Sequence, residues 1–299
     1  MKTKSRSFII IDWLLIILAI LPLVFGVALN ILTDPPTEGI QVTGARVFAI
    51  IDLPFQDLYL SESIVNSWLV VLTLFFTCLY FTHGLSVKGI SKRQVIAEWI
   101  VGACENMVNT NMGEYFSSFG PFIAAIMGLS ACSSLLTLIG LYPPTSDINI
   151  VGGWAILVFI LITYYRAKCG PWGYLKSFGD PVPFLAPLNI ISELATPVSM
   201  AFRHYGNVLS GSVISVLLAA GLQGLSALVL GWLPGFLGEI PFLQIGIPAI
   251  LSIYFDIFSG CLQAFIFAML TMLYIAGAFN LEGYEARKAK KLAKKKKQN

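Results

Sequence analysis

Apolar residues along this chain fall into runs long enough to cross a lipid bilayer as helices. A spanning helix needs ~20 predominantly apolar residues, and six runs meet that length or come close to it. A seventh segment, 94–113, gathers its apolar residues on one helical face, which is typical of an amphipathic helix at the membrane interface. The six runs cover 8–32, 63–82, 119–141, 149–165, 181–222 and 247–279. The pattern predicts an all-α polytopic membrane protein with six spanning helices and one interfacial amphipathic helix.

The fifth run carries a stripe of polar residues. Read at steps of three and four, its polar side chains share one face of an otherwise apolar helix. Arg203 belongs to this stripe and lies well inside any spanning segment. The stripe consists of Asn189, Glu193, Thr196, Ser199, Arg203, Asn207 and Ser210.

An arginine inside a membrane segment needs an explanation. An unpaired cation there is unfavourable by roughly 3 kcal/mol on insertion scales, so it indicates a function by default. A structural ion pair and a side chain that reaches the headgroups are the alternatives. The second is disfavoured because ~20 residues lie on either side of Arg203 before the apolar run ends. We therefore interpret Arg203 as a functional residue.

The sixth run bears a second polar stripe. Ser252, Asp256, Ser259 and Gln263 recur at steps of four, three and four, which places them on one helical face. Asp256 is the only charged residue of that run. A buried acid in a membrane helix is either a structural partner or part of an ion path. Two long helices that each carry a polar stripe predict a hydrophilic route between them.

Composition agrees with a membrane protein and argues against conventional catalysis. Of the 299 residues, 57% are hydrophobic and 12% are charged, which is more apolar surface than a soluble domain of this length can bury. The five cysteines are scattered without a CxxC pair, so they predict neither disulfides nor metal ligands. The sequence contains no Gly-rich phosphate loop, nucleophile elbow or zinc spacing.

Positive charge predicts the orientation of the chain. The two termini and the loops after the second and fourth spans contain 17 of the 19 Lys and Arg, and all four lie on one side of a six-span topology. By the positive-inside rule this side is the cytoplasm. The first run, 8–32, is either a retained helix or a signal peptide with small residues before a cleavage site. Its length and Asp12 favour a retained helix.

Two segments resemble the signatures of subunit a of bacterial F-type ATP synthases. They are PVSMAFRHYGNVLSG at 197–211 and LQAFIFAMLTMLYIA at 262–276. The similarity extends over about 63–278 and includes the DINI segment that opens the fourth span. The specific part of the pattern is an arginine followed four residues later by asparagine, together with the downstream Gln-Ala-Phe.

The resemblance implies an ion-translocating stator subunit, against which a ring of c subunits turns. Arg203 takes the position of the essential stator arginine, Asn207 that of its neighbour, and Gln263 that of a polar partner facing the arginine. Two half-channels would lead H⁺ or Na⁺ to carboxylates of the c ring, and the arginine would prevent leakage. The expected ion-path residues are Arg203, Asn207, Gln263, Asp256, Ser199, Glu193, Ser212, Ser252 and Ser259.

The resemblance also implies the partners and the location. We expect a subunit of a two-sector ATPase in the bacterial cell membrane, with both termini cytoplasmic. Its partners would be the c ring, the b subunits of the peripheral stalk and lipid, with no nucleic acid. No catalytic site, cofactor or metal of its own is expected. The expected parts are an N-terminal span and outside loop at 1–62, an ion-channel domain at 63–280 and a basic tail at 281–299.

The chain departs from the family pattern around both stripes. His204 and Tyr205 follow the arginine, where the family often has RLFGN. Ser212 stands where many members have glutamate, and Asp256 stands where many have histidine. At ~1.5 Å per residue, Ser212 lies ~13.5 Å beyond Arg203, and Asp256 lies ~10.5 Å before Gln263 on a helix of opposite direction. We hypothesise that the acid of the outer half-channel has moved from the fifth helix to the sixth.

Two other functions remain open from the residues alone. A stand-alone ion-coupled transporter or channel would also combine long apolar helices with polar stripes. No internal repeat relates the two halves of the chain, which lowers that alternative because such repeats are common in secondary transporters. A membrane anchor without transport is the third interpretation.

Overall fold

Six long helices dominate the structure, a computed structural model of the chain. It describes residues 6–33, 44–52, 54, 57–87, 91–179, 182–230, 246, 250–251, 253–281, 283–285 and 287–289. Within these residues, six helices are long and apolar enough to cross a membrane. They are Ser7–Thr33, Glu62–Thr82, Glu114–Ile139, Ile148–Cys169, Pro183–Val229 and Ile253–Ala278. The predicted all-α polytopic fold is confirmed.

The elements follow the predicted order, with a few additions. The helices are α1 (Arg6–Thr33), α2 (Glu62–Thr82), α3 (Lys92–Met112), α4 (Gly120–Leu135), α5 (Ile148–Cys169), α6 (Pro171–Ser177), α7 (Ala186–Leu230) and α10 (Gly260–Ala278). The strands β1 (Val47–Ile51) and β2 (Leu58–Ser61) form an antiparallel hairpin. Short 3-10 turns lie at Glu114–Phe119, Leu136–Ile139, Pro144–Ser146 and Pro183–Leu185, and a π-helix, Ile253–Ser259, leads into α10. The sequence did not predict the hairpin, α6 or the π-helix.

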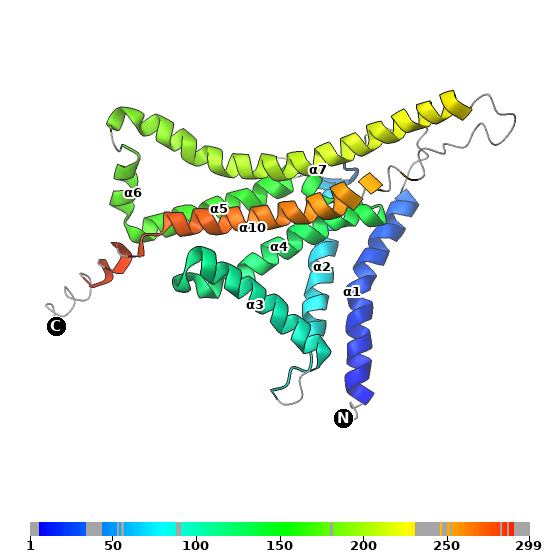
Figure 1. Ribbon diagram of the computed structural model, residues 1–299, viewed down its shortest axis with the longest axis horizontal. Helices are drawn as coiled ribbons and strands as arrows, with labels where there is room; N and C mark the ends of the chain where they lie inside the picture. Colours follow the sequence, from blue (N-terminus) through cyan, green and yellow to red (C-terminus); the bar gives the residue numbers. More distant parts are fainter. Residues whose placement is uncertain are drawn as a thin grey trace.

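Helix α1 packs along α2 (Figure 1). Near its start, side-chain contacts also join it to the end of α2 and to the beginning of α3. The Asp12 carboxylate accepts a hydrogen bond from Arg93 at 2.8 Å and lies 3.0 Å from the ring of His83. Farther along, Gly26 lies against the side chain of Leu69, where a Cβ would come within 2.7 Å. Asp12, whose charge is unusual for a signal peptide, is therefore an ion-pair partner of Arg93 in the folded chain. Retention of α1 in the mature protein stays a prediction.

Helix α7 is too long for a simple perpendicular crossing. Its 45 residues extend ~67 Å at ~1.5 Å per residue, about twice the ~30 Å hydrocarbon core. Figure 1 shows α7 and α10 running antiparallel along the length of the molecule and crosswise to α1 and α2. The two helices that carry the polar stripes, α7 and α10, are therefore steeply inclined to α1 and α2.

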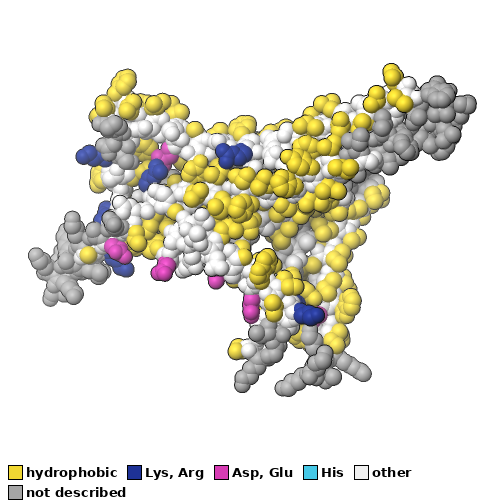
Figure 2. Space-filling view, in the orientation of Figure 1, with side chains coloured by type: hydrophobic (Ala, Val, Ile, Leu, Met, Phe, Trp, Pro, Cys, Tyr) yellow, Lys and Arg dark blue, Asp and Glu magenta, His cyan; other side chains and the backbone are white. Residues whose placement is uncertain are grey.

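The core is built where α10 packs against α4 and α5. Phe267, Met272 and Ile275 of α10 are fully buried there, together with Ile123 of α4 and Val158 of α5. The outer surface has the opposite character. Large apolar side chains cover much of the visible face of α1 and α7 (Figure 2). Such a surface is suited to contact with lipid or with other membrane subunits.

A close helix–helix approach occurs at Gly260, where α10 begins. A Cβ at this position would lie 2.8 Å from Cβ of Ser134 on α4, which is shorter than a real carbon–carbon contact. Glycine is therefore required for the helices to pack at this distance.

Gly260→Ala should overpack this contact and destabilise the subunit by ~1–3 kcal/mol. Ser134→Gly removes the opposing Cβ, so the double variant should recover most of the loss. The measurement is the midpoint of thermal dissociation of the purified complex. Gly277→Ala, on the same helix but with no atom within 4 Å of the new methyl group, is the matched control. Equal midpoints for Gly260→Ala and Gly277→Ala would contradict the close packing.

Candidate functional site

Helix α7 has one buried face and one uncovered face around Arg203. Met200, Ala201 and His204 are buried, whereas Phe202 and Arg203 are exposed. The side chain of Arg203 makes no ion pair or hydrogen bond with any residue that the structure describes. An ion pair between Arg203 and Asp256, the structural alternative to a functional arginine, is likewise absent from the described chain.

His204 points the opposite way from its neighbour, into the helix bundle. Its ring is fully buried, with Trp154 and Phe267 packed against it edge to face. Its Nε2 lies 3.2 Å from the hydroxyl of Ser130 on α4, while its Nδ1 is buried without a hydrogen-bond partner among the described residues. His204 thus anchors α7 to α4 and fixes the rotation of the helix that leaves Arg203 uncovered.

A polar cavity of about 320 Å³ opens beside the first half of α7. Its walls come from α5, α7 and α10, and from the residue that follows α6. Three of the predicted stripe residues, Asn189, Glu193 and Thr196, contribute to it. The full lining is Phe159, Ile162, Arg166, Phe178, Asn189, Ser192, Glu193, Thr196 and Tyr274.

Glu193 is held firmly at this cavity. Its Oε2 lies 2.8 Å from Nη1 of Arg166, and its Oε1 accepts a hydrogen bond from the Tyr174 hydroxyl at 2.8 Å. Burial first, and then this hydrogen bond, raise the pKa of Tyr174 above its usual value. The hydroxyl therefore keeps its proton at neutral pH and remains a donor. Both oxygens of the carboxylate are occupied by charge-assisted bonds.

Asp256 lies on the π-helix that precedes α10 and is half-buried. Its neighbour Phe255 packs against Gly211 of α7, where a Cβ would approach the ring to 3.1 Å. Ser212, the next residue of α7, is exposed. The contact brings the neighbouring residues Ser212 and Asp256 to a similar level of the two helices, and their place on an ion path stays a prediction.

Gln263 differs from the expectation that it faces the arginine. Its side chain is buried, at 3% exposure, on the same face of α10 as Ala264 and Phe267, whereas Arg203 is exposed. No side-chain hydrogen bond joins Gln263 and Arg203 in the described chain. The face of α10 that carries Gln263 packs into the core together with Ala264 and Phe267, which helical spacing alone does not reveal.

The remaining predicted ion-path residues are distributed along the two helices. On α7, Ser199 is exposed and Asn207 is half-buried. On the π-helix, Ser259 is half-buried. Ser252 lies outside the described residues. The structure therefore brings Glu193 into a cavity and Asp256 beside α7, and leaves Arg203 between them on an open face.

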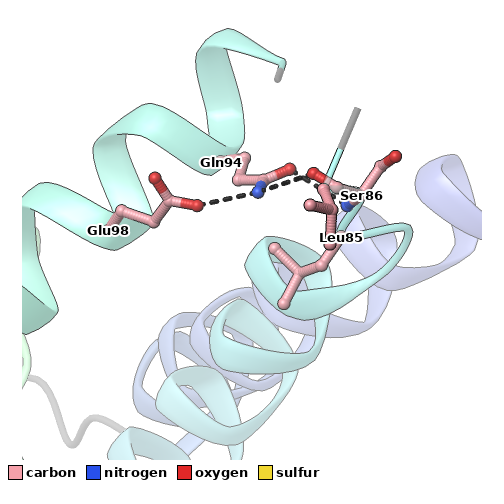
Figure 3. A pocket seen from close by; sticks show the side chains of 5 residues that line it. Leu85, Ser86, Gln94 and Glu98 are labelled. Carbon is pink, nitrogen blue, oxygen red and sulfur yellow. Dashed lines mark hydrogen bonds between the residues drawn. The ribbon is translucent and has the colours of Figure 1, made fainter. Parts of the chain in front are cut away.

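A second cavity, of about 350 Å³, lies where the chain turns from α2 into α3 (Figure 3). The Gln94 side chain bonds both the N–H and the C=O of Ser86 at 3.1 Å, and it donates to Glu98 at 2.7 Å. These bonds fix the start of α3. None of the predicted ion-path residues lines this cavity.

Three features of the site were missed from the sequence. Arg166 was counted only as a topogenic charge, because its partner Glu193 is 27 residues away and on another helix. Tyr174 gave no signal, since α6 was assigned to a loop. His204 departs from the family pattern, and this departure was the one available clue to its special position.

The fold and the two ionisable sites define a polytopic membrane protein with charged groups on two long helices. The model of the ATP synthase A chain family matches residues 64–276. The chain is 32% identical over 224 residues to ATP synthase subunit a 3 of Pelobacter propionicus, covering 73% of this chain and 87% of that protein. It is 29% identical over 237 residues to ATP synthase subunit a 1 of Crocosphaera subtropica, covering 78% and 94%.

A third relative, ATP synthase subunit a of Legionella pneumophila, is 29% identical over 220 residues, covering 73% of this chain and 86% of that protein. The chain belongs to the ATP synthase A chain family, as its two signature segments indicated. It is a multi-pass subunit of the membrane sector of an ATP synthase, with a role in ion translocation. Helix α1 and the β-hairpin precede the matched region.

Proposed function

We propose that this chain is the stator that carries ions to and from a rotating c ring, with Arg203 as the fixed charge between two half-channels. The observation that carries this proposal is the exposed position of Arg203 on an apolar helix, without an ion-pair partner in the described chain. An unpaired cation in a membrane is costly, so its counter-charge is expected from another subunit. A mid-membrane carboxylate of each c subunit meets this requirement.

Arginine suits a barrier between two ion paths. It attracts a deprotonated rotor carboxylate and repels a free proton or sodium ion, so ions travel with the ring and do not leak past it. Its guanidinium stays protonated at any relevant pH, unlike a buried lysine. One charge that crosses 100 mV releases ~2.3 kcal/mol, so several ions must cross for each ATP. The chain itself makes and breaks no phosphate bond in this proposal.

The two half-channels would lie at the two ends of α7. The cavity around Glu193 is the inner one, and it lies at the end of α5 that carries the basic residues Arg166 and Lys168. Asp256 and Ser212 belong to the outer one. They support the idea that the outer acid resides on the last helix in this chain. The transported ion is H⁺ or Na⁺.

The rest of the assembly follows from the same proposal. The positive-inside rule supports a cytoplasmic position for both termini and for the loop after α5. The bacterial relatives support the bacterial plasma membrane as the location of the complex. The c ring would cover the Arg203 face of α7. The b subunits of the peripheral stalk and lipid would share the remaining apolar surface.

Arg203→Ala should abolish ATP-driven ion uptake into inverted membrane vesicles, because it removes the charge that discharges the rotor site. Arg203→Lys should retain less than about a tenth of the uptake, since a point charge on a flexible stem does not reproduce the guanidinium. Assembly should persist in both, as Arg203 makes no bond to the described chain. Vesicles carrying Arg203→Ala that still take up ions on addition of ATP would refute the proposal.

Asp256→Asn should slow ion uptake at least about tenfold, because the outer half-channel loses its titratable group. The double variant Ser212→Glu with Asp256→Asn should recover part of the rate, since both positions lie at the same level. Asp52→Asn, an exposed acid in the outer loop, is the control for loss of one negative charge. Full uptake in Asp256→Asn alone would remove Asp256 from the ion path. No recovery in the double variant would refute only the relocation of the acid.

A further inference from the structure

A clasp of one ion pair and one hydrogen bond surrounds Glu193 on α7. We define this clasp as Arg166, Tyr174 and Glu193, which come from α5, α6 and α7. Arg166 and Tyr174 each bond one carboxylate oxygen at 2.8 Å, and the guanidinium also lies 5.6 Å from the centre of the Tyr174 ring. Arg166 and Tyr174 therefore stabilise each other through a cation–π contact, in addition to binding the carboxylate.

The clasp is placed by rigid local structure. Tyr174 lies in α6, and the ring of Phe178, the residue after this helix, packs against it in a tilted arrangement with ring centroids 5.0 Å apart. The carbonyl of Phe178 accepts a hydrogen bond from Asn189 of α7 at 2.8 Å, which ties the end of α6 to the start of α7. This connection fixes the distance between the Tyr174 hydroxyl and Glu193. The arrangement is thus built into the fold between α5 and α7.

The two charged partners differ in exposure. The side chain of Glu193 is 12% exposed, whereas that of Arg166 is 37% exposed. The carboxylate is therefore the enclosed partner, and the guanidinium occupies the more open side. The titratable side chains that line the cavity are Arg166, Glu193 and Tyr274, with Tyr174 bonded at its edge. Arg166 is the one cation among them.

We propose that Arg166, with Tyr174, is a positioning residue that holds Glu193 across the inner cavity, and that a transported cation passes only by displacing the guanidinium from the carboxylate. This proposal rests on the proposed function, in which the cavity is the inner half-channel. A guanidinium and a proton or sodium ion compete for the same oxygens, so Arg166 weakens cation retention at Glu193. Rapid release matters because ions must leave this cavity at each step of the ring.

The test uses inverted vesicles with the whole synthase, in which the cytoplasmic face is exposed to the medium. ATP-driven uptake is measured against the cation concentration outside, by varying pH without sodium and by varying sodium at fixed pH. In Arg166→Gln the carboxylate loses its competing charge and holds cations more tightly. The half-saturating concentration of the transported cation should fall about tenfold, which for H⁺ is a shift of about one pH unit upward.

Matched variants separate this role from a structural one. Lys168→Gln removes a positive charge from the same end of α5, but Lys168 contacts Tyr115 outside the cavity and should leave the half-saturating concentration unchanged. Arg166→Lys should restore most of the wild-type value. Tyr174→Phe removes one of the two bonds and should shift the value in the same direction by less than Arg166→Gln does. In a Glu193→Gln background, Arg166→Gln should have no further effect.

The proposal fails if Arg166→Gln leaves the half-saturating concentration within twofold of wild type, or if it causes the same shift in the Glu193→Gln background. If Arg166→Gln does not assemble, the test uses Tyr174→Phe and Arg166→Lys instead. An unchanged half-saturating concentration in Tyr174→Phe would then contradict the clasp. These outcomes are distinct from failure of the proposed function. That failure would show as persistent uptake in Arg203→Ala, whatever the values for Arg166.

Discussion

A cation on the uncovered face of a membrane helix is the constraint on which the rest of this structure depends. Arg203 has no ion-pair partner in the described chain, so the helix that carries it must be held by its other face. Met200, Ala201 and His204 supply that face, and His204 adds a hydrogen bond to Ser130 on α4. The buried contacts on one side give α7 a fixed rotation, which leaves the charge of Arg203 exposed on the other side. The partner of the charge is then expected outside the chain, which is the physical basis of a stator.

The two carboxylates of the long helices have different environments, which fits different tasks. Glu193 is enclosed and bonded at both oxygens by groups from two other helices. Asp256 is half-buried on a π-helix, a rare element that is frequent at functional sites because it re-aims side chains within a helix. Ions that reach the arginine from opposite sides would therefore meet one pre-organised site and one more adaptable site. In the proposed mechanism, control of ion release would then lie at Glu193.

Hydropathy was sufficient to predict the six spanning helices, because these depend on local pattern. The amphipathic character of α3 and the functional role of Arg203 stay predictions. A similar level of Ser212 and Asp256 was expected from helix rise together with the assumption that Gln263 faces Arg203. The burial of Gln263 did not follow from the sequence, since helical spacing does not show which face of α10 the core covers. The partners of Glu193 were equally out of reach, because Arg166 and Tyr174 approach it only through the packing of α5 and α6 on α7. Sequence periodicity places a residue on a face, but tertiary packing decides what that face contacts.

Cross-linking to the rotor tests most directly whether the Arg203 face of α7 is the stator surface. The whole synthase would carry Ser199→Cys, one helical turn from Arg203 and exposed, with the five native cysteines replaced. A second cysteine would lie one turn from the carboxylate of the rotor helix. The account predicts a disulfide between them that stops ATP-driven ion uptake and is reversed by reduction, and none for Ile17→Cys, which is exposed on α1. A rotor cross-link from Ile17→Cys with none from Ser199→Cys would contradict it.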